Sequence, residues 1–188
     1  MTSELDLERF LGDLRSLVNV DSKSRDPDGI AQVADILEER LRAAGLEPRR
    51  HTPDAEGGPC LEIKSEGDTA ESFDVLLLGH MDTVFPRGTA AERPFDVDGG
   101  RAYGPGVADM KSGVLLAINA MERLREQGRL GKVCLALNCD EEIGSCYSKP
   151  WIIDLARRSR YALVLEPARA TGALVLERKG GEVFSFEI

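Results

Sequence analysis

A histidine and several carboxylates follow the apolar runs of this sequence, at the points where buried strands would end. His80 and Asp82 come directly after the run Val75–Gly79, and Glu166 follows Ala162–Leu165. In an open α/β sheet, ligands bind outside the carboxyl ends of the strands. Residues i and i+2 of an extended chain point the same way, so the Asp82 carboxylate can orient the His80 ring, as acids commonly do for metal-bound imidazoles.

Further acids lie at two similar positions. The run Asp140, Glu141, Glu142 follows the apolar Val133–Leu137, and Asp109 ends a glycine-rich stretch just before a predicted helix. Taken singly, these are ordinary features: an acidic turn, a helix N-cap, a loop acid. Taken together, they supply oxygen and imidazole ligands without thiolates, which suit zinc, manganese or cobalt. Two cations that share a carboxylate would suit hydrolysis through a bridging water.

Apolar spacing predicts the elements that position these groups. Helices are predicted where apolar residues recur every three or four positions: 7–18, 28–45, 111–127 and 148–160, the last capped by Ser148. Strands are predicted for short apolar or alternating runs between turn residues: 46–51, 61–64, 75–79, 133–137, 162–165, 173–176 and 183–188. Residues 83–108 are predicted to be a long loop with short strands.

Buried strands that alternate with helices indicate the α/β class. We expect a three-layer α/β/α sandwich, with a mixed, mostly parallel central sheet and helices on both faces. The sequence stops at Ile188 inside a strand-like run, so we expect this fold to be incomplete at its C-terminus.

The overall composition narrows the classes of function. The 188 residues carry 24 lysines and arginines against 33 aspartates and glutamates, a formal net charge of −9. Such an acidic chain is a poor partner for nucleic-acid phosphates or an anionic membrane surface, so we expect neither partner. No basic stretch followed by an apolar one begins the chain, and the four cysteines form no Cys-x-x-Cys pair. We therefore expect a cytoplasmic protein with reduced thiols.

Four segments, in this order, resemble the dinuclear zinc peptidases and deacylases. They are Leu78-Gly-His-Met-Asp-Thr-Val, Tyr103-Gly-Pro-Gly-Val-Ala-Asp-Met-Lys-Ser-Gly, Asp140-Glu-Glu-Ile-Gly-Ser and Glu166-Pro. That family includes glutamate carboxypeptidases, aminoacylases, acetylornithine deacetylases and succinyl-diaminopimelate desuccinylases. Thr83-Val-Phe-Pro and Gly104-Pro-Gly look closest to the glutamate carboxypeptidase branch.

The resemblance implies a zinc-peptidase-like fold and a role for each matching residue. Asp109 would bridge two zinc ions, for which cobalt or manganese could substitute, and the peptide bond after it is often cis in the family. His80 and Glu166 would complete the shell of one ion, and Glu142 would bind the other. Each complete site would hold two zinc ions.

The implied reaction is metal-dependent hydrolysis of an amide bond in a small peptide or an N-acyl amino acid. Glu141 would be the general base toward a metal-bridged water and would then protonate the leaving amine. Asp82 would orient His80.

The chain departs from the family pattern at the second metal. That ion needs a further histidine from far downstream, beyond a lid and dimerisation domain, and the chain holds only His51 and His80. His51 precedes the motifs and is expected to be a surface residue. We therefore expect residues 1–188 to be the N-terminal portion of the catalytic domain, without the lid or the C-terminal catalytic segment. This chain alone would be weakly active or inactive, and its full-length form would be a homodimer.

Two other classes of protein stay open. The chain could be a non-catalytic module that keeps the fold as a metal-binding or interaction domain, although such a module has no need of a free base at Glu141. A nucleotide-binding α/β domain is disfavoured, because Gly104-Pro-Gly lacks the third glycine of a dinucleotide-binding loop.

Overall fold

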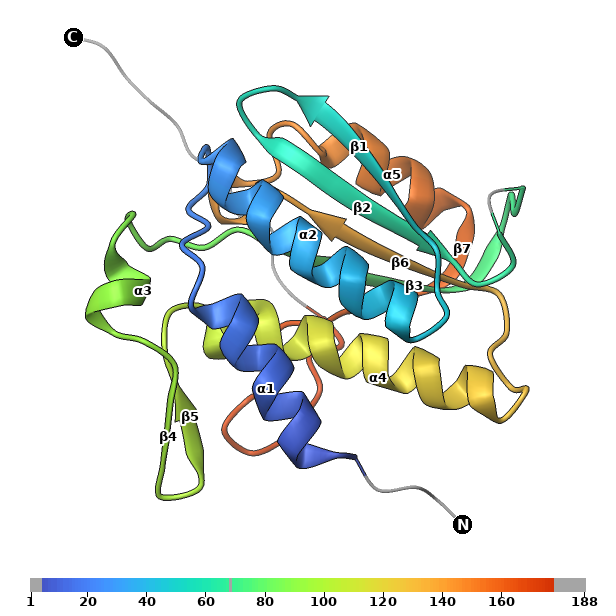
Figure 1. Ribbon diagram of the computed structural model, residues 1–188. Coiled ribbons are helices and arrows are strands. Elements are labelled where there is room, and N and C mark those ends of the chain that lie inside the picture. Colours follow the sequence, from blue (N-terminus) through green and yellow to red (C-terminus); the bar gives the residue numbers. More distant parts are fainter. Residues whose placement is uncertain (1–4, 68, 178–188) are drawn as a thin grey trace, which may run out of the picture.

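The computed structural model describes residues 5–67 and 69–177 of the chain, and its centre is a five-stranded sheet (Figure 1). The order across the sheet is β1-β2-β6-β3-β7. The strands are β1 Pro48–Asp54, β2 Gly58–Lys64, β3 Phe73–His80, β6 Val133–Asn138 and β7 Ser159–Val164. β6, β3 and β7 pair in parallel, and β2 pairs antiparallel with both β1 and β6, so four of the five described strands run one way. The predicted mixed, mostly parallel sheet is confirmed.

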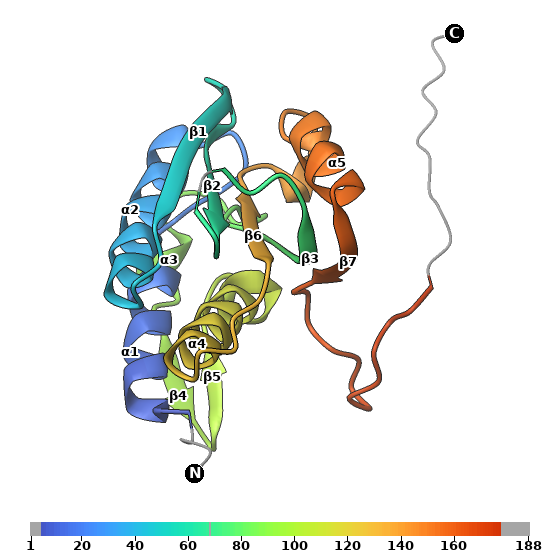
Figure 2. The same cartoon turned by 90° about the vertical axis from the view of Figure 1, so that its right-hand side faces the viewer.

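Helices cover both faces of the sheet (Figure 2). Helices α1 (Leu7–Val18), α2 (Pro27–Ala43) and α4 (Ser112–Glu126) lie on one face, and α5 (Lys149–Arg157) lies on the other. Because side chains alternate along a strand, β6 serves two cores. Its Leu135 and Leu137 pack with the first three helices, whereas its Cys134 and Ala136 pack with Leu155 of α5. The three-layer α/β/α architecture is therefore as predicted.

The helix ends follow local signals in the sequence. The Asp6 carboxylate accepts from the backbone N–H of Arg9, and the Asp26 carboxylate accepts from that of Gly29, so an aspartate caps each of the first two helices. Gly45 follows α2 with φ of +70°, a conformation that glycine adopts without strain.

The predicted long loop contains only short elements. They are the helix α3 (Thr89–Glu92) and the antiparallel pair β4 (Asp96–Asp98) and β5 (Arg101–Tyr103). The irregular turn Val107–Lys111 then leads into α4, and the peptide bond between Asp109 and Met110 within it is cis, as the family resemblance implied. No helix in the described ranges is long and apolar enough to cross a bilayer.

Two predictions about the C-terminal part are wrong. The strand predicted at 162–165 exists as β7, but it is not buried: Tyr161, Leu163 and Val164 are 57%, 54% and 60% exposed. The reason is its position at the edge, where β3 is its sole neighbour among the described strands. Residues 173–176 form no strand, because they have no strand partner, and Leu176 is 92% exposed. The strand predicted at 183–188 lies outside the described residues.

The prediction for α5 is also corrected in detail. Ser148 precedes the helix, but its hydroxyl donates to the Asp140 carboxylate instead of capping the helix. The helix ends at Arg157 rather than near residue 160, because the chain turns directly into β7.

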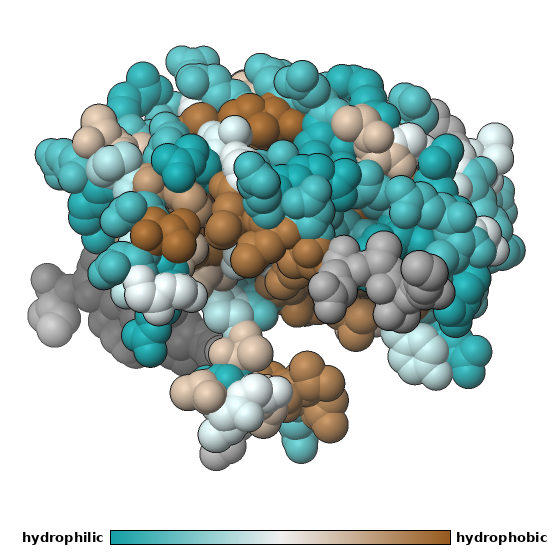
Figure 3. Space-filling view, turned by 60° about the horizontal axis from the view of Figure 1, so that its bottom comes forward, coloured by the Kyte–Doolittle hydropathy of each residue, from teal (hydrophilic) through white to brown (hydrophobic). Residues whose placement is uncertain are grey.

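On the face shown in Figure 3, apolar residues gather in the middle of the surface.

Candidate metal centre

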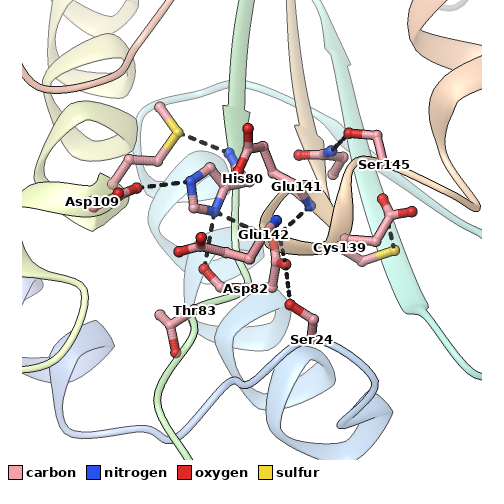
Figure 4. Close-up of polar contacts among 12 residues, drawn as sticks. Ser24, His80, Asp82, Thr83, Asp109, Cys139, Glu141, Glu142 and Ser145 are labelled. Atoms are coloured by element: carbon pink, nitrogen blue, oxygen red, sulfur yellow. Dashed lines mark hydrogen bonds and ion pairs between the residues drawn. The ribbon is translucent and has the colours of Figure 1, made fainter. Parts of the chain in front are cut away.

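Three strand ends and one helix start bring the predicted site residues to one edge of the sheet. His80 is the last residue of β3, Glu141 and Glu142 lie in the short 3-10 turn Glu141–Ile143 after β6, and Glu166 follows β7. Since β6, β3 and β7 are parallel neighbours, their carboxyl ends share one edge. Asp109 reaches the same edge from the turn before α4 (Figure 4).

A close backbone contact helps to bring Glu166 to this edge. Gly113, in the first turn of α4, lies against the backbone of Leu165, and a Cβ atom at this position would overlap the Leu165 carbonyl oxygen. Glycine therefore lets the chain that leaves β7 pass against the start of α4. Glu166 and Asp109 consequently approach the His80 ring from two different elements.

The imidazole of His80 is the centre of the cluster. Its Nε2 atom lies 3.0 Å from Oδ1 of Asp109 and 3.5 Å from Oε1 of Glu166. Potential ligand atoms of His80, Asp109 and Glu142 lie within 4.8 Å of one another, and so do those of His80, Glu141 and Glu166. The structure thus brings all five predicted side chains together, while their individual roles stay predictions.

The opposite ring nitrogen of His80 is held by Asp82. The ring is 1% exposed, and its Nδ1 lies 2.9 Å from the backbone carbonyl oxygen of Asp82 and 3.3 Å from its Oδ1. The shorter contact is therefore with the carbonyl, whereas the sequence suggested the carboxylate. A cation bound at Nε2 would leave the ring's proton on Nδ1, where the ring donates to Asp82.

The Asp82 carboxylate has other partners, which sequence reasoning missed. Its Oδ1 accepts from the backbone N–H of Glu141 at 3.1 Å, and its Oδ2 accepts from that of Glu142 at 3.1 Å. The hydroxyl of Ser24 also donates to Oδ2, at 2.6 Å. Asp82 therefore holds the backbone of the turn that carries both glutamates. No local pattern signals these bonds, since the three donors lie 58 to 60 residues away.

Asp140, next to the two glutamates in sequence, faces a different way. It is fully buried and accepts from the backbone N–H groups of Tyr147 and Ser148 and from the Ser148 hydroxyl. These partners all lie just before α5. Asp140 thus fixes the connection to that helix and is absent from both groups of possible metal ligands.

The cluster contains more carboxylates than cationic groups and so carries an excess of negative charge. Burial opposes protonation of His80, but hydrogen bonds and charges from Asp82 and Glu166 prevail and raise its pKa to about 11. Burial raises the pKa of Glu141, and despite the opposing charge of His80, the charges of Glu166 and Asp82 raise it further.

Burial and the charge of Asp109 likewise raise the pKa of Glu142. Carboxylates that repel one another in this way are stabilised by a cation. The donor set of one imidazole and several carboxylates therefore fits a divalent metal such as zinc.

A pocket of about 280 Å³ opens beside these acids. Its lining includes the apolar side chains of Leu78, Ile152 and Val164, and His80, Glu141 and Glu166 also face it. An organic group in this pocket would lie directly beside the cluster of possible ligands.

His51, predicted to lie on the surface, is instead half-buried. Its ring packs edge-on against Trp151 of α5, with ring centroids 4.5 Å apart, and burial lowers its pKa. It belongs to neither group of possible metal ligands, which agrees with its exclusion from the site.

Solved structures share this fold with the chain. Human carnosine dipeptidase 1 superposes with a TM-score of 0.71 at 18% identity, over 88% of this chain and 40% of that one. An M20 family metallo-carboxypeptidase from Sulfolobus solfataricus gives 0.67 at 18% identity, over 88% and 38%. At such identities the likeness establishes the fold alone.

Sequence comparison then gives the family. The profile of Peptidase family M20/M25/M40 matches residues 76–180, and the chain belongs to this family. It is 35% identical over 160 residues to carboxypeptidase G2 of Pseudomonas sp. (strain RS-16), which is 84% of this chain and 38% of that protein. It is 44% identical over 84 residues to succinyl-diaminopimelate desuccinylase of Gluconobacter oxydans (strain 621H), 43% of this chain and 22% of that protein. The chain thus spans less than two fifths of the length of either relative.

Proposed function

We propose that the chain supplies the metal ligands and the general base of a hydrolase that cleaves amide bonds in small peptides or N-acyl amino acids. The observation that carries this proposal is that two groups of possible ligand atoms meet at His80. Those of His80, Asp109 and Glu142 lie within 4.8 Å of one another, and so do those of His80, Glu141 and Glu166, which also line the pocket. The names of the two relatives, a carboxypeptidase and a desuccinylase, support a reaction of the carboxypeptidase or deacylase type.

The proposed cofactor is zinc, two ions per complete site, with cobalt or manganese as substitutes. His80, Asp109 and Glu166 would hold one ion, and Asp109 and Glu142 the other. Bound there, the ions would supply Lewis-acid polarisation of the amide carbonyl and a water of lowered pKa.

Glu141 is the proposed general base. It takes a proton from the attacking water and returns it to the leaving nitrogen, so one side chain serves both halves of the reaction. Burial and the neighbouring carboxylates raise its pKa, which makes it a stronger base toward water than a solvated glutamate. Asp82 keeps Glu141 in place through the backbone N–H of that residue.

We also propose that residues 1–188 are the N-terminal portion of the catalytic domain of a longer cytoplasmic protein that forms a homodimer. The support for a longer protein is the share of the relatives that the chain spans, 38% and 22%. A lid domain and a C-terminal segment with a further metal-binding histidine would complete the site. The chain by itself is then weakly active or inactive.

The test compares metal content and hydrolysis of an N-acyl glutamate for Glu141→Gln, in this chain and in the longest form that its reading frame encodes. We expect Glu141→Gln to retain bound zinc and to lose at least about 100-fold of the hydrolysis rate, since general bases typically contribute that much. Glu126→Gln, at an exposed position on α4, is the matched control and should change neither quantity.

Three outcomes would count against the proposal. Unchanged hydrolysis in Glu141→Gln would remove the base from the mechanism. Full turnover by the 188-residue chain would contradict the proposed incompleteness. Zinc binding without hydrolysis by the longest form would favour the alternative function, a non-catalytic metal-binding or interaction module.

A further inference from the structure

The segment between α1 and α2 lies directly beside the end of β3. The backbone N–H of Ser24 donates to the carbonyl of Thr83 at 3.2 Å, and that of Thr83 donates to the carbonyl of Ser22 at 2.8 Å. These bonds form a short parallel bridge between Lys23 and Thr83. Residues 22–24 are thereby fixed against the residue that follows Asp82.

Two buried serines of this segment differ in what their hydroxyls contact. Ser22 is 0% exposed and Ser24 is 8% exposed. The Ser24 hydroxyl donates to Oδ2 of Asp82 at 2.6 Å, whereas the Ser22 hydroxyl has no hydrogen-bond partner among the described residues. The two positions therefore form a matched pair: each places a small buried hydroxyl in the same segment, but only that of Ser24 contacts Asp82. Figure 4 shows Ser24 beside Asp82.

The contact made by Ser24 adds a side-chain hydrogen bond to a carboxylate that two backbone amides already hold. The torsion about the Cβ–Cγ bond of an aspartate is soft. In this chain, one oxygen of Asp82 accepts from the N–H of Glu141, and the other accepts from both the N–H of Glu142 and the Ser24 hydroxyl. The short bond from Ser24 comes from the side of Asp82 opposite the turn (Figure 4), so it fixes the plane in which the carboxylate meets the two amides.

We propose that Ser24 is a positioning residue for the metal centre and its base. It acts through Asp82 on the backbone of Glu141 and Glu142, and so sets where the base and one metal ligand lie. This inference rests on the proposed function. Ser24 lies outside residues 76–180, the part that matches the family profile, so the N-terminal segment takes part in the site as well as in the core.

The test is Ser24→Ala with Ser22→Ala as its control, in the longest form of the protein loaded with zinc. A hydrogen bond to a charged group is strong enough for its loss to lower kcat by roughly 10- to 100-fold. We expect this loss in Ser24→Ala with KM changed less than about threefold, because the substrate pocket is untouched. Ser22→Ala should stay near the wild-type kcat.

A third variant separates the hydrogen bond from packing. Ser24→Cys nearly keeps the side-chain volume but offers a weak donor, so it should lose kcat as Ser24→Ala does. Wild-type kcat in Ser24→Cys, or equal kcat in Ser24→Ala and Ser22→Ala, would overturn the inference.

A second measurement needs no activity. In the metal-free 188-residue chain, the amide protons of Glu141 and Glu142 should lose protection from hydrogen exchange in Ser24→Ala and not in Ser22→Ala. If the wild type binds no zinc and cleaves no amide, the proposed function fails, and this exchange result still decides whether Ser24 orders the turn. Unchanged protection in Ser24→Ala would refute its positioning role.

Discussion

Two of the groups of charged side chains within the described part of the chain differ in their balance of charge. The first, here called the helix cluster, consists of Arg9, Asp13, Arg40, Asn119 and Glu122 on three helices. Oε2 of Glu122 lies 2.6 Å from Nη2 of Arg40 and 2.7 Å from Nη2 of Arg9. Nε of Arg40 lies 2.8 Å from Oδ2 of Asp13. Two arginines thus face two acids, and the cluster is neutral.

The second group, here called the centre cluster, consists of His80, Asp109, Glu141, Glu142 and Glu166. It sets one imidazole against four carboxylates. The effect on the pKa values is opposite in the two groups. Burial alone would raise the pKa of Glu122, but the hydrogen bonds from Arg40 and Arg9 lower it.

Burial raises the pKa of Glu141 and Glu142, and neighbouring acids add to the rise. The helix cluster balances its charges within the chain, whereas the centre cluster leaves an excess of negative charge that a cation would offset. The comparison separates a charge-balanced network from the proposed metal site.

The largest effect on stability should come from breaking the helix cluster. Arg40→Met removes a partner from the buried carboxylate of Glu122 and from the partly exposed carboxylate of Asp13. Removing one member of a buried ion pair typically lowers the free energy of unfolding by about 3–5 kcal/mol, and denaturant titration would measure it. Arg42→Met is the control, since Arg42 pairs with Glu38 on the exposed side of the same helix and should change stability by at most about 0.5 kcal/mol. Equal losses of stability in Arg40→Met and Arg42→Met would show that the helix cluster contributes no more than an exposed ion pair.

The next effect should come from filling the centre cluster. Zinc at 100 times its Kd should raise the free energy of unfolding by about 2.7 kcal/mol, because it binds the folded chain. Asp109→Asn removes a charged ligand and should lose most of this gain, whereas Asp98→Asn, an exposed acid of β4, should keep it. A gain that survives in Asp109→Asn would place the zinc elsewhere.

The smallest effect should appear as a pH dependence of the helix cluster. The folded-state pKa of Glu122 lies below its ordinary value of 4.5, so its contribution to stability is present above that value and is lost as the pH falls through the folded-state pKa. The destabilisation by Glu122→Gln should therefore be constant from pH 7 to about pH 5 and shrink below about pH 4.5. Thermal unfolding of both proteins across this range measures it. A difference that grows in acid would mean that Glu122 is not held as a carboxylate.

Much of the fold was predictable because the signals are local. Apolar spacing over a few residues gave α1 and α4 nearly to the residue, and short apolar runs gave β3 and β6. The burial of β7 was not predictable, since its run of apolar residues reads like that of β6. What differs is the number of neighbours in the sheet: β6 lies between β2 and β3, and β7 lies at an edge.

The residues of the candidate site were predictable from the sequence, but the contacts that hold them in place were not. The sequence shows that acids and a histidine follow predicted strands or precede a predicted helix. These residues are His80, Asp109, Glu142 and Glu166. Asp140 and Glu141, however, are adjacent acids that nothing in the sequence distinguishes. Only the turn after β6 directs Asp140 toward α5 and Glu141 toward His80.

The sequence by itself determined which side chains could bind a metal and at which ends of which elements they stand, because those facts depend on neighbours along the chain. The tertiary structure alone decided that Ser24 contacts Asp82, 58 positions away in the sequence. It also decided that the Asp82 carboxylate binds the backbone amides of two glutamates, while the His80 ring makes its shorter contact with the Asp82 carbonyl. Contacts of that kind depend on how separate elements pack, and no spacing within one element encodes them.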